Sequence, residues 1–332
     1  MTSPLITVGV PVYRGARYLA ETLESIRVQT CGDLRVLISI DGPDPESEAV
    51  CQPFLRDKRF SVVTQPERLG WVGNIDWLTA QVDTPFWCYY QQDDLTAPCY
   101  FEKLLEAALC HLSAAVVYCD IVAFGTQSWQ TSQPSVTGIP AARQLALLYA
   151  HHSAVAFRGL TRVEALRESG GLITNEVENY SVDTTWMSQM ACWGDLIRVP
   201  GDWYFKRYHE DNVHTKWADW PEEKRLHAWI AHCADLLEIT FKVGANPQER
   251  RLLWLATVNR LTSPRVAPGY LQMKEITQEQ RMALLENFLH YLQKVRCSKL
   301  PYKMKSTWDD LALWTRGFFS RPPGLVEKRP AA

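Results

Sequence analysis

Short apolar runs and longer amphipathic stretches follow one another along the first 120 residues. The runs Ile6–Val10, Leu34–Ile40 and Phe60–Thr64 have the length and composition of buried strands. Between the first two runs, apolar residues recur three to four positions apart over 19–26, which is the spacing of one helix face. Strand, helix and strand in this order predict a βαβ unit with a parallel sheet.

The same alternation continues to about residue 208. A helix is expected after Thr161, which would form a capping box with Glu164 before Gly170 ends the helix. The other elements expected here are strands at Phe86–Tyr90, Ala114–Asp120 and Ala154–Phe157, a hairpin-like pair at Leu196–Pro200 and Trp203–Tyr208, and helices after Gly70, after Pro98 and over Ala141–Ala150.

From Trp217 onward the strand pattern stops and only helical spacing remains. We therefore predict an α/β domain over 1–216 in two halves (1–120 and 121–216), a helical C-terminal subdomain over 217–320 and a disordered tail over 321–332. The subdomain is rich in tryptophan and would pack on the α/β domain or on a second copy of the chain. Its last helix, Trp308–Phe319, has a mixed face that suits core packing, a partner or a membrane surface.

The composition excludes several classes of protein. The chain has 332 residues with 35 basic and 37 acidic side chains, so no basic face for nucleic acid is expected. Its nine cysteines show no CxxC pair and no metal-ligand spacing, which favours reduced thiols in a cytoplasmic protein. We find neither a signal peptide nor an apolar run of membrane-spanning length, so we expect a soluble protein.

The strongest chemical signal lies at the end of the strand expected at 86–90. Gln91, Gln92, Asp93 and Asp94 follow it directly. Adjacent buried carboxylates are costly without a cation, so the pair should face a cleft at the carboxyl end of the strand, where open α/β sheets bind ligands. Carboxylates there suit Mg²⁺ or Mn²⁺ held together with substrate phosphates. Alternatively, one aspartate caps the following helix, and both interpretations agree if Asp93 binds metal while Asp94 shapes the loop.

Two further turns carry polar side chains. Asp41 ends the second strand and is either a contact to a nucleotide or a turn-former before Gly42. Arg68 precedes the helix that contains Asn74, where a cation can meet a phosphate or make a surface salt bridge. The first loop lacks GxGxxG, which argues against a dinucleotide-binding fold.

Four segments, in this order, resemble the family 2 glycosyltransferases of the GT-A fold. They are Val8–Tyr13, Ile38–Gly42, Arg68–Asn74 and Gln92–Asp94. The resemblance covers roughly the first two-thirds of the chain. It implies a central mixed sheet flanked by helices, with the nucleotide bound by 1–120 and the acceptor by 121–216.

The resemblance also implies site residues. Those expected to bind the nucleotide sugar are Pro11, Tyr13, Asp41, Arg68, Asn74, Gln92, Asp93 and Arg207. Those expected to bind Mn²⁺ or Mg²⁺ are Asp93 and Asp94 of the DXD-type motif and His209, with His214 as the alternative. His209 equally suits a phosphate contact or a plain exposed loop. The sequence departs from the family pattern at Gln91, where a leading aspartate is usual, and at Gly42, where a second aspartate is common.

Asp183 stands at the start of a predicted helix after a Gly-Gly segment, and its spacing alone favours a helix N-cap. The resemblance instead implies that Asp183 is the general base, with Val182 where the family usually has a glutamate. An inverting transfer needs one such carboxylate beside the incoming hydroxyl. The other residues expected on the acceptor side are His152, Arg158 and Trp186, although His152 also suits plain surface.

These features predict an inverting, hexosyltransferase-like enzyme of surface polysaccharide or glycoconjugate biosynthesis. It would move a sugar from a nucleotide-diphosphate sugar to a hydroxyl of a carbohydrate or glycoconjugate acceptor. The donor expected first is a UDP-sugar. A homodimer through the C-terminal helices and a peripheral membrane contact are further expectations. The alternatives are a nucleotidyltransferase, for which Arg14–Arg17 is a poor basic loop, and a non-catalytic relative that binds sugars or scaffolds a complex.

Overall fold

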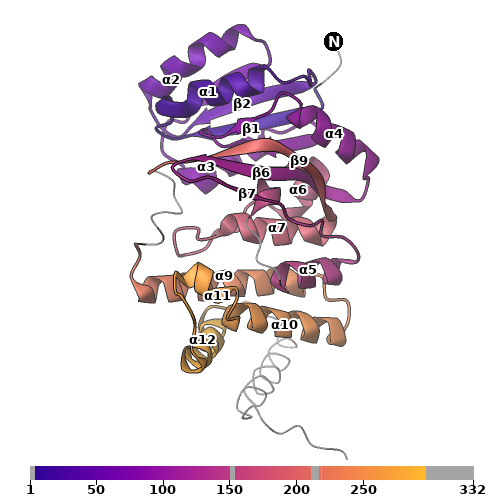
Figure 1. The fold of residues 1–332 in the computed structure, drawn as a ribbon, viewed down its shortest axis with the longest axis vertical. Helices are drawn as coiled ribbons and strands as arrows, with labels where there is room; N and C mark the ends of the chain where they lie inside the picture. Colours follow the sequence, from indigo (N-terminus) through magenta and orange to yellow (C-terminus); the bar gives the residue numbers. More distant parts are fainter. Residues whose placement is uncertain (1–3, 150–153, 211–216, 218, 297–332) are drawn as a thin grey trace, which may run out of the picture. The chain divides into compact units, whose positions relative to one another are not determined.

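The computed structural model describes residues 4–149, 154–210, 217 and 219–296. The chain divides into two compact units, Met1–Trp220 and Pro221–Ala332. The first unit is a mixed α/β structure and the second is helical (Figure 1). The predicted fold class, a GT-A-like α/β sheet with a helical C-terminal region, is confirmed.

The first unit is organised around one sheet. Its strand order among the described residues is β3-β2-β1-β4-β8-β6-β9-β5, with β7 beside β6. The strands are β1 (Ile6–Val12), β2 (Leu34–Ile40), β3 (Phe60–Thr64), β4 (Phe86–Tyr89), β5 (Leu95–Thr96), β6 (Ala114–Gly125), β7 (Trp129–Thr131), β8 (Leu160–Arg162) and β9 (Asp195–Tyr208). Strands β3, β2, β1 and β4 are parallel, whereas β8 pairs antiparallel with both β4 and β6.

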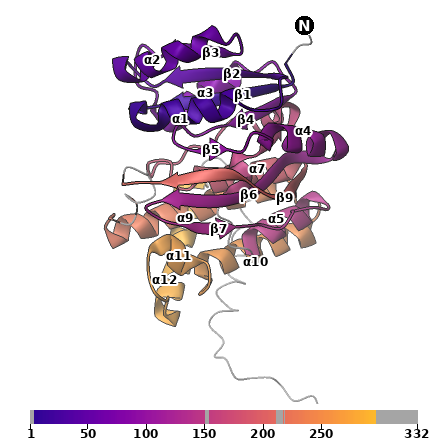
Figure 2. The same cartoon turned by 45° about the horizontal axis from the view of Figure 1, so that its top comes forward.

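Helices connect the strands and bury their apolar faces. Helix α1 packs Leu19, Leu23 and Ile26 inward with no exposure, as the periodicity predicts. Figure 2 shows α1 and α2 beside the strands of the parallel half. The helices are α1 (Ala16–Arg27), α2 (Pro45–Cys51), η1 (Gln52–Arg56), α3 (Gly70–Ala80), α4 (Tyr100–Cys110), α5 (Pro140–Tyr149), η2 (Val155–Arg158), α6 (Val163–Ser169) and α7 (Val182–Trp193).

The parallel register brings the polar strand ends together. Val12 of β1 pairs with Ile40 of β2, and Gly9 of β1 pairs with Tyr89 of β4. The segments that follow these strands therefore leave the sheet at one edge, which is the edge where open α/β sheets bind ligands.

One predicted strand and one predicted hairpin were wrong. Ala154–Phe157 is not a strand, because Val155–Arg158 forms a 3₁₀ turn entered through the left-handed Ala154. Leu196–Pro200 and Trp203–Tyr208 are not a hairpin but parts of the single strand β9. Strand β9 pairs in parallel with the equally long β6, and register shifts around Asp120 accommodate the interruption that the sequence suggested.

The predicted capping box at Thr161 was also wrong. Thr161 lies in β8, where it pairs with both β4 and β6, and the N-cap of α6 is Arg162 without a side-chain cap. The end of this helix was predicted correctly, since Gly170 takes a left-handed conformation as its C-cap.

The second unit consists of helices with their own interior. They are α9 (Glu222–Phe241), α10 (Pro247–Thr262), α11 (Ala267–Leu271), α12 (Gln278–Tyr291) and η3 (Leu292–Arg296). Trp229 stacks on Tyr270 at 4.5 Å, and Trp254 lies 6.1 Å from Phe288, all within this unit. Trp229 and Trp254 have no exposed surface, so these tryptophans are core residues. The helix predicted at 308–319 and the tail at 321–332 lie outside the described residues.

Among the described residues, no helix combines the length and the apolar composition that crossing a membrane would need.

Candidate active site

The acidic turn after β4 is tied to β9 through Asp94. Its buried carboxylate accepts hydrogen bonds from the Arg207 backbone N–H and the Tyr204 hydroxyl, each at 2.8 Å. Burial, and next the charge of Asp93, raise the pKa of Asp94 to about 7, against the lowering effect of Arg158. The N-cap of α4 is Cys99, so the alternative that an aspartate caps this helix was wrong. Asp94 shapes and anchors the turn.

Asp93 turns the other way and meets His209 at the end of β9. Asp93 Oδ2 and His209 Nε2 are 2.8 Å apart, and both side chains keep a small exposed fraction. Arg207 holds the backbone of Asp93 in place. Its Nε donates to the Asp93 carbonyl at 2.9 Å, and its guanidinium lies over the Tyr18 ring at 4.5 Å. A carboxylate and an imidazole thus meet at this edge of the sheet.

The donor set of Asp93 and His209 fits Mn²⁺ or Mg²⁺. Such ions are commonly held by one or two carboxylates, with substrate phosphates and water as further ligands. In the part of the chain that the structure describes, no cluster of three or more His, Cys, Asp or Glu side chains could hold a metal by itself. The remaining ligands would therefore come from the substrate. His214, the alternative ligand, lies outside the described residues.

Asp183 is the second residue of α7. Ser181 is the N-cap, so the prediction of an N-cap aspartate was wrong, although Asp183 Oδ1 does accept from the Thr184 N–H at 2.9 Å. Burial raises the pKa of Asp183, and the nearby cations Arg158 and, more weakly, Lys206 oppose that rise. A carboxylate with a raised pKa, held among fixed cations, has the properties of a general base.

Arg158 links the acidic turn to Asp183. Its side chain is buried; Nε lies 3.7 Å from Asp94 Oδ2, and Nη2 donates to Gln91 Oε1 at 3.3 Å. Burial works against its charge, but Tyr204, Asp94 and Asp183 together raise the pKa of Arg158. Gln91 stands where the resembling family has its leading aspartate, and here it serves as a neutral partner of this arginine.

Lys206 is a residue of the site that sequence reasoning missed. It lies on β9 between Tyr204 and Tyr208, and its ammonium donates to the Tyr208 hydroxyl at 3.2 Å. Burial, and next Arg158, lower its pKa to about 8, while Asp94, Asp183 and Asp93 oppose that shift. The sequence contains no usable signal for it. Residues two apart share a face of a strand, but the contact of Tyr204 with Asp94, which identifies that face, joins residues 110 positions apart.

The predicted nucleotide contacts gather at the ends of β1 and β2. The Arg68 guanidinium covers the half-exposed Tyr13 ring at 4.1 Å, and its Nε lies 3.9 Å from Asp41 Oδ2. Asp41 Oδ1 also accepts from the Leu69 N–H at 2.6 Å. Arg68, Tyr13 and Asp41 therefore form one cluster that presents an aromatic face, a cation and a carboxylate.

Three other predicted nucleotide contacts lie beside this cluster or beneath it. Gln92 brackets Tyr13, since its Oε1 accepts from the Tyr13 N–H at 2.8 Å and its Nε2 donates to the Tyr13 carbonyl at 3.1 Å. Pro11 lies in β1 and is partly buried. Asn74 is buried and hydrogen-bonds to both the hydroxyl and the carbonyl of Ser39, so its amide holds α3 against β2.

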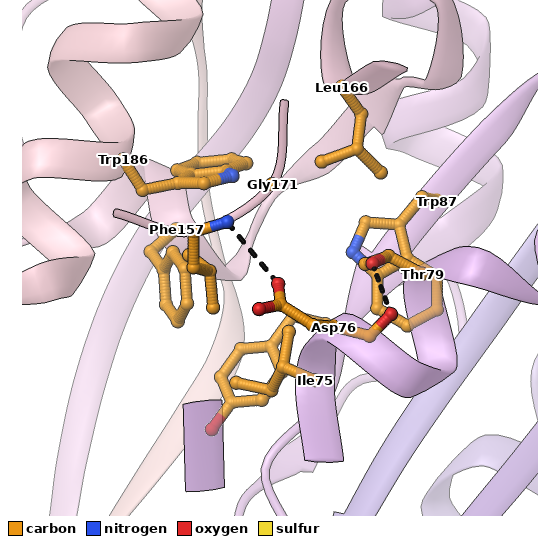
Figure 3. A pocket seen from close by; sticks show the side chains of 10 residues that line it. Ile75, Asp76, Thr79, Trp87, Phe157, Leu166, Gly171 and Trp186 are labelled. Carbon is orange, nitrogen blue, oxygen red and sulfur yellow. Dashed lines mark hydrogen bonds between the residues drawn. The ribbon is translucent and has the colours of Figure 1, made fainter. Parts of the chain in front are cut away.

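A small pocket lies behind the site, one turn along α7 from Asp183. Trp186 is almost fully buried and packs edge-on to Phe157 at 5.1 Å, so this predicted acceptor-side residue lies in the interior. Figure 3 shows Trp186, Phe157 and Trp87 around the carboxylate of Asp76, which accepts from the Leu172 N–H at 3.3 Å. Burial raises the pKa of Asp76. His152, the third acceptor-side residue, lies outside the described residues.

This fold and arrangement define a class of protein. A parallel β3-β2-β1-β4 half, an acidic turn after β4 that reaches a histidine, and an aspartate at the head of a later helix together describe a GT-A glycosyltransferase. The chain belongs to glycosyl transferase family 2, which matches residues 7–170, about half of the chain.

Two curated relatives match shorter stretches. EpsH of Bacillus subtilis (strain 168) is 31% identical over 110 residues, which are 32% of this chain and 31% of EpsH. Glycosyltransferase GlyG of Streptococcus pneumoniae serotype 4 (strain ATCC BAA-334 / TIGR4) is 35% identical over 69 residues, 20% of this chain and 23% of GlyG. The matched stretches thus span less than a third of either relative.

Solved structures share the fold over most of the chain. S. aureus TarS 1–349 in complex with UDP-GlcNAc has a TM-score of 0.64 at 14% identity, covering 86% of this chain and 80% of TarS 1–349. Mannosyltransferase PcManGT from Pyrobaculum calidifontis, in complex with GDP-Man and Mn²⁺, has a TM-score of 0.56 at 14% identity, covering 97% of this chain and 89% of PcManGT. At these identities the likeness concerns the fold alone.

Proposed function

We propose that this protein transfers a sugar, with inversion, from a nucleotide-diphosphate sugar to a hydroxyl of a carbohydrate or glycoconjugate acceptor. One observation carries the proposal: the Asp93–His209 pair and Asp183 belong to one electrostatic network, which runs through Asp94, Arg158 and Lys206. A site for a metal-bound diphosphate and a carboxylate base are the two parts that a direct displacement at a sugar carbon requires.

The donor end of the reaction would be built by the first three parallel strands. Tyr13, Asp41 and Arg68 would bind the base and ribose, with Gln92 fixing the loop that carries Tyr13. Asp93 and His209 would hold Mn²⁺ or Mg²⁺, which neutralises the leaving diphosphate when bound. Arg207 keeps both ligands in place through the Asp93 carbonyl.

The acceptor end would depend on Asp183. This carboxylate would take the proton of the incoming hydroxyl as the hydroxyl attacks the anomeric carbon, and no covalent intermediate on the protein is needed. Arg158 and Lys206 favour the ionised form of Asp183, which is the form that can act as a base. Protonated Asp183 cannot accept the proton, so transfer should require a pH at which it is ionised.

We infer a UDP-sugar as the donor in first place, with a GDP-sugar as the alternative, because structures of this fold have been solved with UDP-GlcNAc and with GDP-Man. Surface polysaccharide or glycoconjugate synthesis would be the setting. The eight described cysteines are all unpaired, which supports a reducing compartment such as the cytoplasm.

The first test is a thermal-shift screen of UDP-, GDP- and dTDP-sugars with and without Mn²⁺. A donor at 100 times its dissociation constant should stabilise the protein by ~2.7 kcal/mol. Release of nucleoside diphosphate with a carbohydrate acceptor then identifies a glycosyltransferase. Formation of nucleoside triphosphate and sugar 1-phosphate when pyrophosphate is added identifies a nucleotidyltransferase, and binding without turnover identifies a non-catalytic relative. Either of the last two results would refute the proposal.

Asp93→Ala should lose the metal-dependent part of donor binding, because it removes the carboxylate that would connect cation and diphosphate. Calorimetric titration of the identified donor with and without Mn²⁺ measures this. Asp202→Ala is a suitable control, since Asp202 is an exposed carboxylate of β9 whose bond goes to Gln130. Equal donor affinity of Asp93→Ala and wild type would remove Asp93 from the site.

A further inference from the structure

The turn before α7 holds an unusual backbone conformation. Glu178, Asn179 and Ser181 have φ angles of 51°, 57° and 56°, in the left-handed region that residues other than glycine seldom adopt. Asn175 maintains the turn: its Oδ1 accepts from the Tyr180 N–H at 3.1 Å, and its Nδ2 donates to the Tyr180 carbonyl at 2.9 Å. Such strain persists where the surrounding structure fixes it, and it concentrates at functional sites.

The turn presents one aromatic ring to two others. The Tyr180 ring lies 4.8 Å from Trp217 and 5.9 Å from Trp220, and the two indoles are 6.2 Å apart. Tyr180 is buried beneath the tryptophans, which both remain partly exposed. We call these three residues the aromatic cluster. All three belong to the first unit.

The aromatic cluster is close in sequence to the proposed base. Tyr180 precedes Asp183 by three residues, so their α-carbons are at most ~11 Å apart even for extended chain. That distance is comparable to one or two sugar rings. An acceptor of more than one ring is therefore long enough to span from the cluster to Asp183.

We propose that the aromatic cluster binds a neutral pyranose ring of the acceptor. A pyranose has an apolar face of C–H bonds, which packs on an aromatic ring, and a rim of hydroxyls, which suits the polar ends of tryptophan and tyrosine. The inference rests on the proposed function, because it specifies the acceptor of that same site.

The charge near the aromatic cluster favours a neutral sugar over an anionic ligand. Asp219 is an exposed carboxylate that stands between the two tryptophans in the chain. The charge of Asp219 disfavours an anionic lipid surface and an acceptor ring that carries a carboxylate or phosphate. Carboxylates are, on the other hand, good acceptors for sugar hydroxyls.

Saturation-transfer NMR on the full chain tests the proposal. The probes are the methyl glycopyranosides of glucose, galactose, mannose and N-acetylglucosamine, with methyl glucuronide as the charged comparison. We expect saturation of the ring protons of at least one neutral probe, and a signal at least threefold weaker for the glucuronide. No saturation with any neutral probe, or an equal signal with the glucuronide, would overturn the proposal.

Variants locate the binding. Trp217→Ala and Trp220→Ala should each reduce the saturation at least fivefold, while Trp217→Phe, which keeps an aromatic face, should stay within about threefold of wild type. Trp193→Ala is the matched control, since Trp193 is a 51% exposed tryptophan at the far end of α7. A signal that survives in both alanine variants, or falls equally in Trp193→Ala, would refute the cluster as the binding surface. A variant that loses the signal counts only if its thermal midpoint stays within a few degrees of the wild-type value. If neither alanine variant stays folded by this measure, Trp217→Phe decides: loss of the signal in a folded Trp217→Phe would refute the proposal.

The outcome can be separated from that of the proposed function by titrating nucleotide with Mn²⁺ on the same samples. If the tryptophan variants lose glycoside binding but no sample binds nucleotide, the cluster is a glycoside-binding surface and the proposed glycosyltransferase function is refuted. Nucleotide binding with glycoside signals untouched by the substitutions would reject the cluster alone.

Discussion

Three carboxylates and two cations share the candidate site, and the position of each decides its role. Asp94 is buried and fully engaged by the chain, so it anchors the turn; Asp93 keeps an exposed edge and meets a histidine, so it is suited to a metal. Asp183 is held near Arg158 and Lys206. The sequence predicted the carboxylates because each follows a strand or begins a helix. It did not predict Lys206, because a lysine in a strand gives no sign of which face it projects from.

Asp183→Asn should keep the fold and donor binding but lose sugar transfer. The amide oxygen can still accept from the Thr184 N–H, so stability should change by no more than about 1 kcal/mol. Loss of a positioned base should reduce the rate by ~10²–10⁴-fold, with little change in donor affinity. Initial rates with the acceptor found by the screen measure this. Turnover within a few-fold of wild type would show that Asp183 is not the base.

Asp76→Asn should stabilise the protein at neutral pH and have little effect in acid. Burial raises the folded-state pKa of Asp76, so its contribution to stability is most favourable when it is protonated and declines as pH rises through that pKa. Asparagine remains neutral and can still accept from Leu172. The difference in thermal midpoint between variant and wild type should therefore grow from pH 4 to pH 7.5.

The comparison for Asp76 is Asp83→Asn, because Asp83 has a 75% exposed side chain and a surface ion pair with Arg35. Its midpoint difference should stay small across the same pH range. A flat profile for Asp76→Asn would show that the pocket does not disfavour the charged carboxylate.

At the scale of elements, the sequence predicted regular segments better than irregular ones. The run at 154–157 is apolar and short, and such runs do not distinguish a strand from a buried turn. Pro200 and Gly201 look like a turn, yet β6 offers a continuous pairing partner, and the sheet accepts the interruption as a shift of register. Pairing partners lie far away in the chain, so local sequence could not reveal them. Both misread segments carry site residues, Arg158 on η2 and Arg207 on β9.

Gly159→Ala should destabilise the junction between η2 and β8. A β-carbon at Gly159 would lie 2.3 Å from the Val117 carbonyl oxygen and 2.9 Å from the Tyr118 β-carbon, both on the central strand β6. Relief of that overlap moves backbone, so we expect a loss of ~1–3 kcal/mol and displacement of the adjacent Arg158. Urea denaturation with an unchanged m-value measures the loss.

Gly32→Ala is the control for Gly159→Ala, because no atom lies within 4 Å of a β-carbon built at Gly32. Its free energy of unfolding should stay within about 0.5 kcal/mol of the wild-type value. Equal stability of the two variants would mean that the junction is looser than its geometry indicates.

For the whole molecule, the order of helices and strands could be predicted from the sequence. That order explains why residues far apart in the chain meet at the candidate site. Strands β1, β2 and β4 run parallel, so their ends bring Tyr13, Asp41 and Asp93 to one edge although up to 80 residues separate them. The concentration of tryptophans after residue 217 suggested an interaction surface. Two of these tryptophans, Trp229 and Trp254, fill the interior of the helical unit, where they lie against Tyr270 and Phe288.

A chain that ends after Trp220 should fold and bind the donor. Every described residue assigned to the candidate site lies in the unit Met1–Trp220, and the helical unit is held together by its own buried residues. We expect a single cooperative thermal transition and a donor affinity within about threefold of the full chain. If the helical unit forms a dimer, light scattering should give a dimer for the full chain and a monomer for the shortened one; if it serves the acceptor, transfer should fall while donor binding stays. An aggregated or non-cooperative product would show that the α/β unit depends on the helices for its stability, and an unchanged size with unchanged transfer would exclude both roles.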